Sequence, residues 1–110
     1  MLQKKELLDI AMSMDTQSDY EKFYRFAQNY TLHLELEHKT DPSTLFECIR
    51  YCHDKPKIAK NRTGIGGKNV ESLVLWSDYL LNKKELRKLS VTELNYIFAC
   101  CARYCKAKTR

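Results

Sequence analysis

The chain has 110 residues, of which 44% are hydrophobic and 30% are charged, and its formal net charge at pH 7 is +5. This length fits one domain with one modest core, and the composition favours a folded globule over a disordered tail. No apolar run approaches the roughly 18 residues that a membrane span requires. Residues 1–6 lead directly into a polar amphipathic pattern and not into the apolar core of a signal peptide, so we expect none. We therefore expect a cytoplasmic protein without a membrane partner.

The first predicted helix covers about residues 2–14, where an apolar stripe recurs at helical spacing: Leu7, Ile10, Ala11 and Met14. A second helix is predicted to begin at Ser18, because Ser18 and Glu21 have the spacing of a capping box. Its buried stripe would consist of Tyr20, Phe23, Ala27, Tyr30 and Leu34.

The end of this second helix is ambiguous, because leucines at positions 32, 34 and 36 alternate with polar residues as in a strand. No second strand is predicted to pair with this segment, and a lone strand leaves its backbone groups unmatched. We therefore interpret residues 31–37 as the end of a long helix.

A third helix is predicted from Asp41 as N-cap and Pro42 in the first turn. Its apolar stripe would be Leu45, Cys48, Ile49 and Cys52. It should end near Asp54, because Pro56 disfavours a helical residue before it. Residues 54–69, which contain all three glycines of the protein, are predicted to form a loop.

Two more helices are predicted in the second half of the chain. Asn69 caps a fourth helix with a stripe made of Val70, Leu73, Val74, Ser77, Leu80 and Leu81. Residues 83–89 form a short basic connector or a continuation of that helix. Ser90 and Glu93 are spaced as a second capping box. It opens the most regular stripe of the protein: Val91, Leu94, Ile97, Phe98, Cys101, Tyr104 and Cys105.

The sequence thus predicts an all-α fold, a small bundle of four to five helices in a single domain that spans residues 1–110. The domain divides into an acidic half (1–53), a basic glycine loop (54–69) and a basic half (70–110). Residues 1–53 carry six Lys/Arg and nine Asp/Glu, a net charge of −3, whereas residues 54–110 carry thirteen and five, a net charge of +8. Such polarity steers an anionic partner to one side, and either nucleic acid or an acidic protein would respond to it.

The basic glycine loop is the first candidate binding site. Glycine lets backbone N–H groups and a phosphate approach each other, and a helix N-terminus follows near Asn69. The alternative interpretation is a solvated surface loop. The candidate residues here are Lys55, Lys57, Lys60, Arg62, Gly64, Gly66, Gly67 and Lys68.

Two specific phosphate-binding motifs, the P-loop and the KH loop, do not fit this segment. The glycine spacing of a P-loop is absent, and Asn69 stands where its hydroxyl residue is needed. Residues 64–70 resemble the Gly-x-x-Gly loop of KH domains, which clamps a nucleotide backbone. That resemblance covers about seven residues, and a KH fold would need flanking strands where this sequence predicts helix.

The connector and the last helix supply the second group of candidates: Lys83, Lys84, Arg87, Lys88, Arg103 and Lys106. A solvated face with cations near a helix C-terminus is the alternative. Trp76, Tyr96 and Tyr104 could offer stacking surfaces for bases. We interpret Trp76 and Tyr104 as core residues and leave Tyr96 open.

The five cysteines and three histidines predict no catalytic or metal site. Cys48/Cys52 and Cys101/Cys105 could build a four-thiolate zinc site only if their helices faced each other, and core packing is the preferred interpretation. Cys100 belongs to neither pair. No histidine has a carboxylate or nucleophile at a spacing that indicates a triad. We expect neither a cofactor nor enzymatic activity.

The leading hypothesis is a non-enzymatic small helical subunit or accessory protein that binds RNA or DNA backbone. In size, charge and helicity it is similar to the small helical subunits of CRISPR effector complexes, although no motif is shared. The rival is a protein-interaction module, such as an inhibitor or adaptor that docks on an acidic or nucleic-acid-binding surface within a larger complex. A third hypothesis is self-assembly through surplus apolar residues, namely Leu32, Leu36, Leu75 and Trp76.

Overall fold

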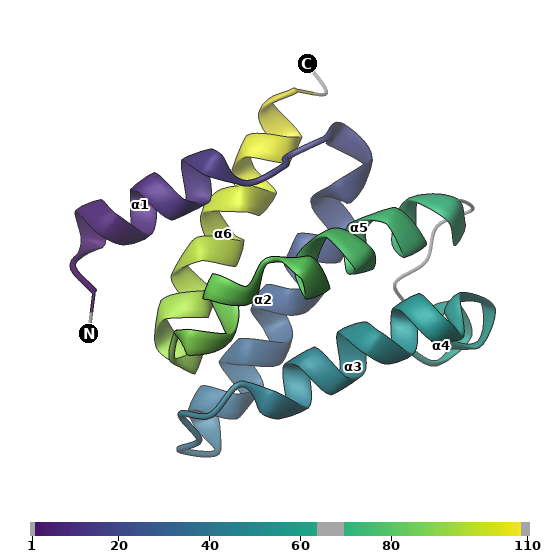
Figure 1. Ribbon diagram of the computed structural model, residues 1–110, viewed down its shortest axis with the longest axis horizontal. Coiled ribbons are helices and arrows are strands. Elements are labelled where there is room, and N and C mark those ends of the chain that lie inside the picture. Colours follow the sequence, from purple (N-terminus) through teal and green to yellow (C-terminus); the bar gives the residue numbers. More distant parts are fainter. Residues whose placement is uncertain (1, 64–69, 109–110) are drawn as a thin grey trace.

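The computed structural model describes the backbone of residues 2–63 and 70–108, and their side chains except those of residues 60–63. This part of the chain is helical and contains no strand, so the prediction of an all-α fold is confirmed (Figure 1). The α-helices are α1 (Lys4–Ser13), α2 (Glu21–Leu36), α3 (Ser43–Asp54), α4 (Pro56–Thr63), α5 (Val70–Asn82) and α6 (Val91–Ala107). Two short 3-10 helices are η1 (Ser18–Tyr20) and η2 (Lys84–Lys88).

The helices pack as two groups around a shared core. In the first group α2 lies along α6, and α1 covers another side of α6. In the second group α3 packs on α5, and α4 contacts both of them. Figure 1 shows η2 as the link that carries the chain from α5 back to α6. Buried apolar side chains from all six of these α-helices belong to one hydrophobic cluster.

Aromatic rings join the two groups at the centre of this cluster. The Trp76 ring of α5 lies 5.4 Å from the Phe23 ring and 5.7 Å from the Tyr24 ring of α2, centroid to centroid. Tyr24 also reaches Phe98 of α6, with ring centroids 6.2 Å apart. Pairs of this kind contribute about 0.5–1.5 kcal/mol beyond the area they bury. Trp76 is therefore a core residue, as predicted, and it cannot belong to a surface for self-assembly.

The ambiguous segment 31–37 continues as helix to Leu36, in agreement with our interpretation. It ends in a Schellman motif, in which the Lys39 N–H donates to the Leu34 carbonyl (2.9 Å) and the His38 N–H donates to the Glu35 carbonyl (2.9 Å). His38 adopts the left-handed backbone conformation that this motif needs, with φ of 60°. The alternating leucines did not produce a strand because the helix satisfies every backbone group locally.

Two predicted helix starts differ in detail from the structure. The Ser18 capping box is wrong: the Tyr20 N–H donates to the Gln17 carbonyl (3.0 Å), which closes a 3-10 turn before α2 begins. At the second start the prediction is wrong by one residue: Pro42 is the N-cap of α3 and Asp41 lies outside the helix, bonded to Ser43 of its first turn. Oδ1 of Asp41 accepts bonds from the Ser43 hydroxyl (2.6 Å) and the Ser43 N–H (3.1 Å). These two bonds lower the pKa of the Asp41 carboxyl below its usual range.

The prediction of a loop over residues 54–69 is wrong for Pro56–Thr63, which forms α4, and residues 64–69 lie outside the described part of the chain. Lys55, the residue before proline, leaves the helical region with φ of −134° and ψ of 62°, and this ends α3. Pro56 then fits the first turn of a new helix, where its missing N–H costs nothing. Ala59 is the buried apolar residue that attaches α4 to the core. This raises the described number of α-helices to six, one more than the largest number predicted.

The predicted capping box at the start of α6 is present. The Glu93 N–H donates to Ser90 Oγ (3.2 Å), and the Ser90 N–H donates to Glu93 Oε1 (2.9 Å). Glu93 Oε2 also accepts a bond from the Leu2 N–H (2.8 Å), which ties the segment before α1 to α6. The bonds from the Ser90 and Leu2 N–H groups lower the pKa of the Glu93 carboxyl.

Acid should therefore destabilise the protein partly through Glu93. Because its pKa is lower in the folded state than in the unfolded chain, its contribution is complete above the unfolded value of about 4.3 and is lost as the pH falls through the folded value. Urea unfolding between about pH 5 and pH 3 should show a shallower loss of stability for Glu93→Gln than for the wild type. Glu6→Gln, which removes an exposed carboxylate of α1, is the control. Equal slopes for all three proteins would contradict this role.

Candidate nucleic-acid interface

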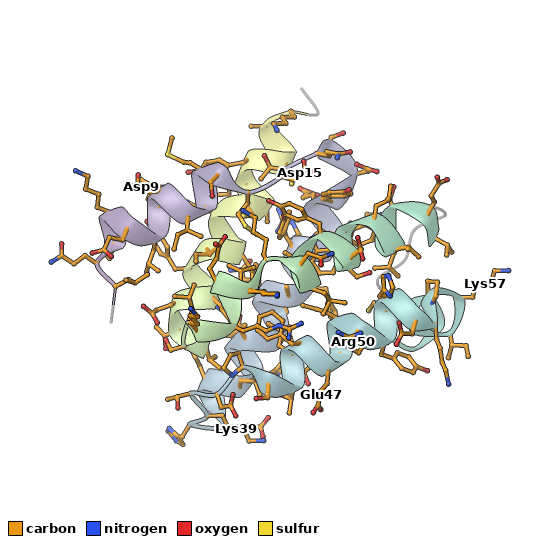
Figure 2. The ribbon with its side chains drawn as sticks, in the orientation of Figure 1. Asp9, Asp15, Lys39, Glu47, Arg50 and Lys57 are labelled. Atoms are coloured by element: carbon orange, nitrogen blue, oxygen red, sulfur yellow. The ribbon has the colours of Figure 1, made fainter. Side chains whose placement is uncertain are left out.

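The structure describes only part of the basic glycine loop. Lys55 and Lys57 are exposed where α3 meets α4, and Figure 2 shows Lys57 projecting from the edge of the molecule. Neither lysine has an acidic partner within ion-pair distance in the described part of the chain. The other predicted residues of this loop fall outside the described region, namely Gly64, Gly66, Gly67, Lys68 and the side chains of Lys60 and Arg62.

The predicted connector is the 3-10 helix η2, and its flanking lysine has a structural role. Lys83 Nζ lies 3.4 Å from Glu85 Oε1 and 5.5 Å from the centroid of the Tyr79 ring. Partial burial would lower the pKa of Lys83, but Tyr79 and Glu85 outweigh it, so the pKa is raised. Lys83 therefore stays charged, and it forms an ion pair with Glu85, the acidic residue of η2.

Three further cations of η2 remain without a counter-charge. Lys84, Arg87 and Lys88 are exposed, and the part of the chain that is described places no carboxylate in ion-pair contact with them. Lys84 and Arg87 are three residues apart, which is one turn of a 3-10 helix, so they share a face. This face turns toward the first half of α3, because Arg87 packs on Phe46 there.

An open cavity of about 290 Å³ lies between η2 and the N-terminal half of α3. Arg87 and Arg50 bring two guanidinium groups to it, from η2 and α3 respectively. The Cζ atom of Arg87 lies 5.6 Å from the centroid of the Phe46 ring, and its Nη2 donates to the Leu81 carbonyl (3.3 Å). The full lining is Asp41, Pro42, Ser43, Phe46, Glu47, Arg50 and Arg87.

Arg50 is not among the predicted site residues, because it belongs to the acidic half of the chain. Figure 2 shows Arg50 and Glu47 on α3, away from Lys57 at the far end of the second helix group. Arg87 is distant from Arg50 in sequence, and the two line one cavity because Arg87 of η2 lies over Phe46 of α3. No spacing rule within one segment could have found this cluster.

The remaining predicted cations lie on α6. Arg103 is exposed and donates to Cys100 Sγ (3.7 Å), and Lys106 is exposed one turn later. Figure 1 places α4 at one edge of the molecule and the end of α6 at another. The described candidates thus occupy three separate elements: the α3–α4 junction, η2 and α6. Of the three, only η2 gathers several cations beside a cavity.

The aromatic candidates for base stacking are mostly covered. Trp76 is fully buried in the core, whereas Tyr96 and Tyr104 are half-buried against it. Tyr104 was expected in the core and is only partly enclosed. It lines a second open cavity, of about 450 Å³, between the end of α1 and the end of α6.

All five cysteines are free thiols. Cys52 donates a hydrogen bond to Cys48, which lowers the pKa of Cys48, while that bond and burial raise the pKa of Cys52. Burial also raises the pKa of Cys105 to about 12. Across the described residues, no group of three or more Cys, His, Asp or Glu side chains is arranged to hold a metal ion. The two cysteine pairs lie on α3 and α6, in different helix groups.

His53 has two acidic neighbours, one of which the sequence did not reveal. Its Nδ1 lies 2.9 Å from Asp54 Oδ1, and its Nε2 lies 3.6 Å from Asp78 Oδ1 of α5. Both ring nitrogens therefore face carboxylates, and His53 links α3 to α5.

The fold and the site define a small all-α protein with a cationic 3-10 helix beside an arginine-lined cavity. No helix in the described ranges has the length and apolarity to cross a bilayer. No family model, no curated protein and no solved structure matches the chain. The function must therefore be inferred from the charges, contacts and cavities of this chain.

Proposed function

We propose that this protein is a non-enzymatic nucleic-acid-binding accessory protein, and that η2 is the centre of its interface. The observation that carries the proposal is the charge balance of this short helix. Glu85, its acidic residue, is engaged by Lys83, so that Lys84, Arg87 and Lys88 have no counter-charge within the described structure. Arg50 adds a fourth cation across the cavity.

Cations in this arrangement suit a phosphate backbone. Exposed Lys and Arg side chains displace the counterions that condense on nucleic acid, and the released ions supply most of the binding free energy. Lys55, Lys57 and Arg103 extend the cationic surface to neighbouring elements, and the polarity between the two halves of the chain orients the approach. The five free thiols support a cytosolic setting.

The proposal is tested by the salt dependence of binding. Fluorescence anisotropy with labelled single-stranded and duplex oligonucleotides should show saturable binding at low salt. With three to five phosphate contacts, the slope of log K against log salt should be about −2.7 to −4.5 for the duplex and about −2 to −3.5 for the single strand. Electrophoretic mobility shift at the same salt concentrations provides an independent check. If neither assay detects binding at low salt, the proposal is wrong.

Exposed apolar side chains favour a second function, docking on a protein partner. Leu32 and Leu36, one turn apart on α2, are 47% and 69% exposed, and Leu75 of α5 is 56% exposed. Exposed apolar residues mark a protein-interaction site where they form a continuous patch. A pull-down that is split into nuclease-treated and untreated halves distinguishes the two functions. A protein partner that persists after nuclease treatment would favour the docking module.

A further inference from the structure

The cavity between α3 and η2 contains chemistry that backbone binding does not use. Phosphate contact requires only cations, yet the lining of this cavity also includes two acidic residues, Asp41 and Glu47, together with Phe46. Its volume of about 290 Å³ is at the lower end of the range for small-molecule sites and is much larger than one phosphate group needs. The lining therefore points to a ligand with an anionic, a hydroxylated and a flat part.

Arg87 is positioned to act as a flat surface and not only as a charge. Its guanidinium lies over the Phe46 ring and is fixed by the bond to the Leu81 carbonyl. A guanidinium that is immobilised on an aromatic ring loses little conformational freedom when a second flat group stacks on it. Nucleobases stack on arginine planes in this way when RNA is single-stranded.

Arg50 is the group in this cavity that is free to bind an anion. It is exposed, and within the described ranges it forms no ion pair, although Glu47 lies on the same helix. Its five N–H donors in a fork suit the oxygens of a phosphate.

The carboxylates of the cavity are suited to accept hydrogen bonds from hydroxyl groups. Oδ1 of Asp41 already accepts both bonds from Ser43, and this bonding keeps the carboxyl ionised. Its other oxygen and the carboxylate of Glu47 are acceptors without a donor among the bonds of the described residues. Carboxylates repel phosphate, so a ligand that carries hydrogen-bond donors as well as an anion suits this lining better than phosphate alone. The ribose 2′-hydroxyl is such a donor.

We infer that the cavity is a subsite for one unpaired ribonucleotide, with the phosphate on Arg50, the base stacked on Arg87, and the ribose hydroxyls toward Asp41 and Glu47. This inference rests on the proposed function and makes it more specific, since it selects single-stranded RNA over DNA and over a duplex. A base within a duplex is already stacked and paired, and it would have to leave the helix to enter the cavity.

Titration of the 15N-labelled protein with adenosine 5′-monophosphate tests the subsite directly. The amide shifts should concentrate in the first half of α3 and in η2. Affinity should be highest for the ribonucleotide and lower for deoxyadenosine 5′-monophosphate, adenosine and inorganic phosphate. If inorganic phosphate binds as tightly as the nucleotide, or if the ribo and deoxyribo forms bind equally, the ribonucleotide assignment is overturned.

Variants separate the subsite from the general interface. Arg50→Gln should lower the affinity for a single-stranded oligoadenylate roughly tenfold or more, because one charge-assisted contact is lost. Arg87→Lys retains the charge but removes the planar guanidinium. It should therefore weaken the binding of adenosine 5′-monophosphate and leave the binding of inorganic phosphate unchanged. The control is the double variant Lys4→Gln/Lys5→Gln, which removes charge on α1 and should have little effect. Circular dichroism melts confirm that each variant is folded.

The outcomes distinguish failure of the ribonucleotide subsite from failure of the proposed nucleic-acid binding. If the oligoadenylate binds with a steep salt dependence but Arg50→Gln and Arg87→Lys behave like the α1 control, the subsite is wrong and the proposed function stands. If no oligonucleotide binds at low salt, the proposed function fails and the subsite fails with it.

Discussion

Trp76→Ala is expected to lower the free energy of unfolding by about 3–5 kcal/mol, the largest effect on stability of any substitution considered for this chain. Trp76 is fully buried, and its ring contacts Phe23 and Tyr24 of α2 from α5. Removal of the ring leaves a cavity at the point where the two helix groups meet. Since domains of this size are stable by about 5–15 kcal/mol, the midpoint of thermal unfolding should fall by more than about 10 °C.

The neighbouring residue provides a matched control. Leu75 is 56% exposed, so Leu75→Ala should change the stability by no more than about 0.5 kcal/mol. Trp76→Phe should fall between the two. It retains an aromatic ring, and Trp76 Nε1 has no hydrogen-bond partner in the described structure, so no bond is lost. Urea unfolding of the three variants would contradict the aromatic core if Leu75→Ala and Trp76→Ala were equally destabilising.

Much of the fold could be predicted because it follows from local patterns. The stripe that begins at Val91 and the capping box of Ser90 and Glu93 define α6 within the sequence itself, and the structure agrees. Pro56 likewise marked the end of α3 at Asp54. These features depend on residues three or four positions apart, whose contacts form within one helix.

The misses have physical causes that are also specific. Helix α4 lacks an apolar stripe, and Ala59 is the residue by which its described part enters the core, so periodicity had little to detect. At Ser18 the spacing of a capping box was present, but the Tyr20–Gln17 bond closed a 3-10 turn instead. Sequence spacing shows that a cap is sterically available, whereas the packing of the preceding segment decides whether it forms.

The candidate site was harder to predict than the fold. Charge counting identified Lys84, Arg87 and Lys88, because they are adjacent in sequence. It could not show that Glu85 forms an ion pair with Lys83, or that Arg50, from the acidic half of the chain, lines the same cavity as Arg87 of η2. Net charge reports on a segment, whereas a binding surface depends on which charges remain unpaired after folding.

The double charge reversal Lys84→Glu/Lys88→Glu is expected to have the largest effect on binding. Both lysines are exposed and make no ion pair in the described parts of the chain, so their reversal removes no contact that stabilises the fold. If each contacts one phosphate, their loss should reduce the slope of log K against log salt by about 2. Repulsion by the new carboxylates should bring the total loss of affinity at low salt to roughly 100-fold.

The control must have the same net charge, because a uniform loss of charge also weakens attraction to nucleic acid. Lys4→Glu/Lys5→Glu provides it, since both lysines are exposed on α1 in the acidic half of the chain. Long-range attraction between the protein and the nucleic acid depends on total charge, so it falls equally in the two double variants. At an ionic strength of about 0.1 M, salt screens this attraction beyond about 10 Å. Direct phosphate contact depends on position, so only the η2 variant should lose both affinity and salt slope. If the two variants lose affinity equally at every salt concentration, binding follows net charge alone, and η2 is not the interface.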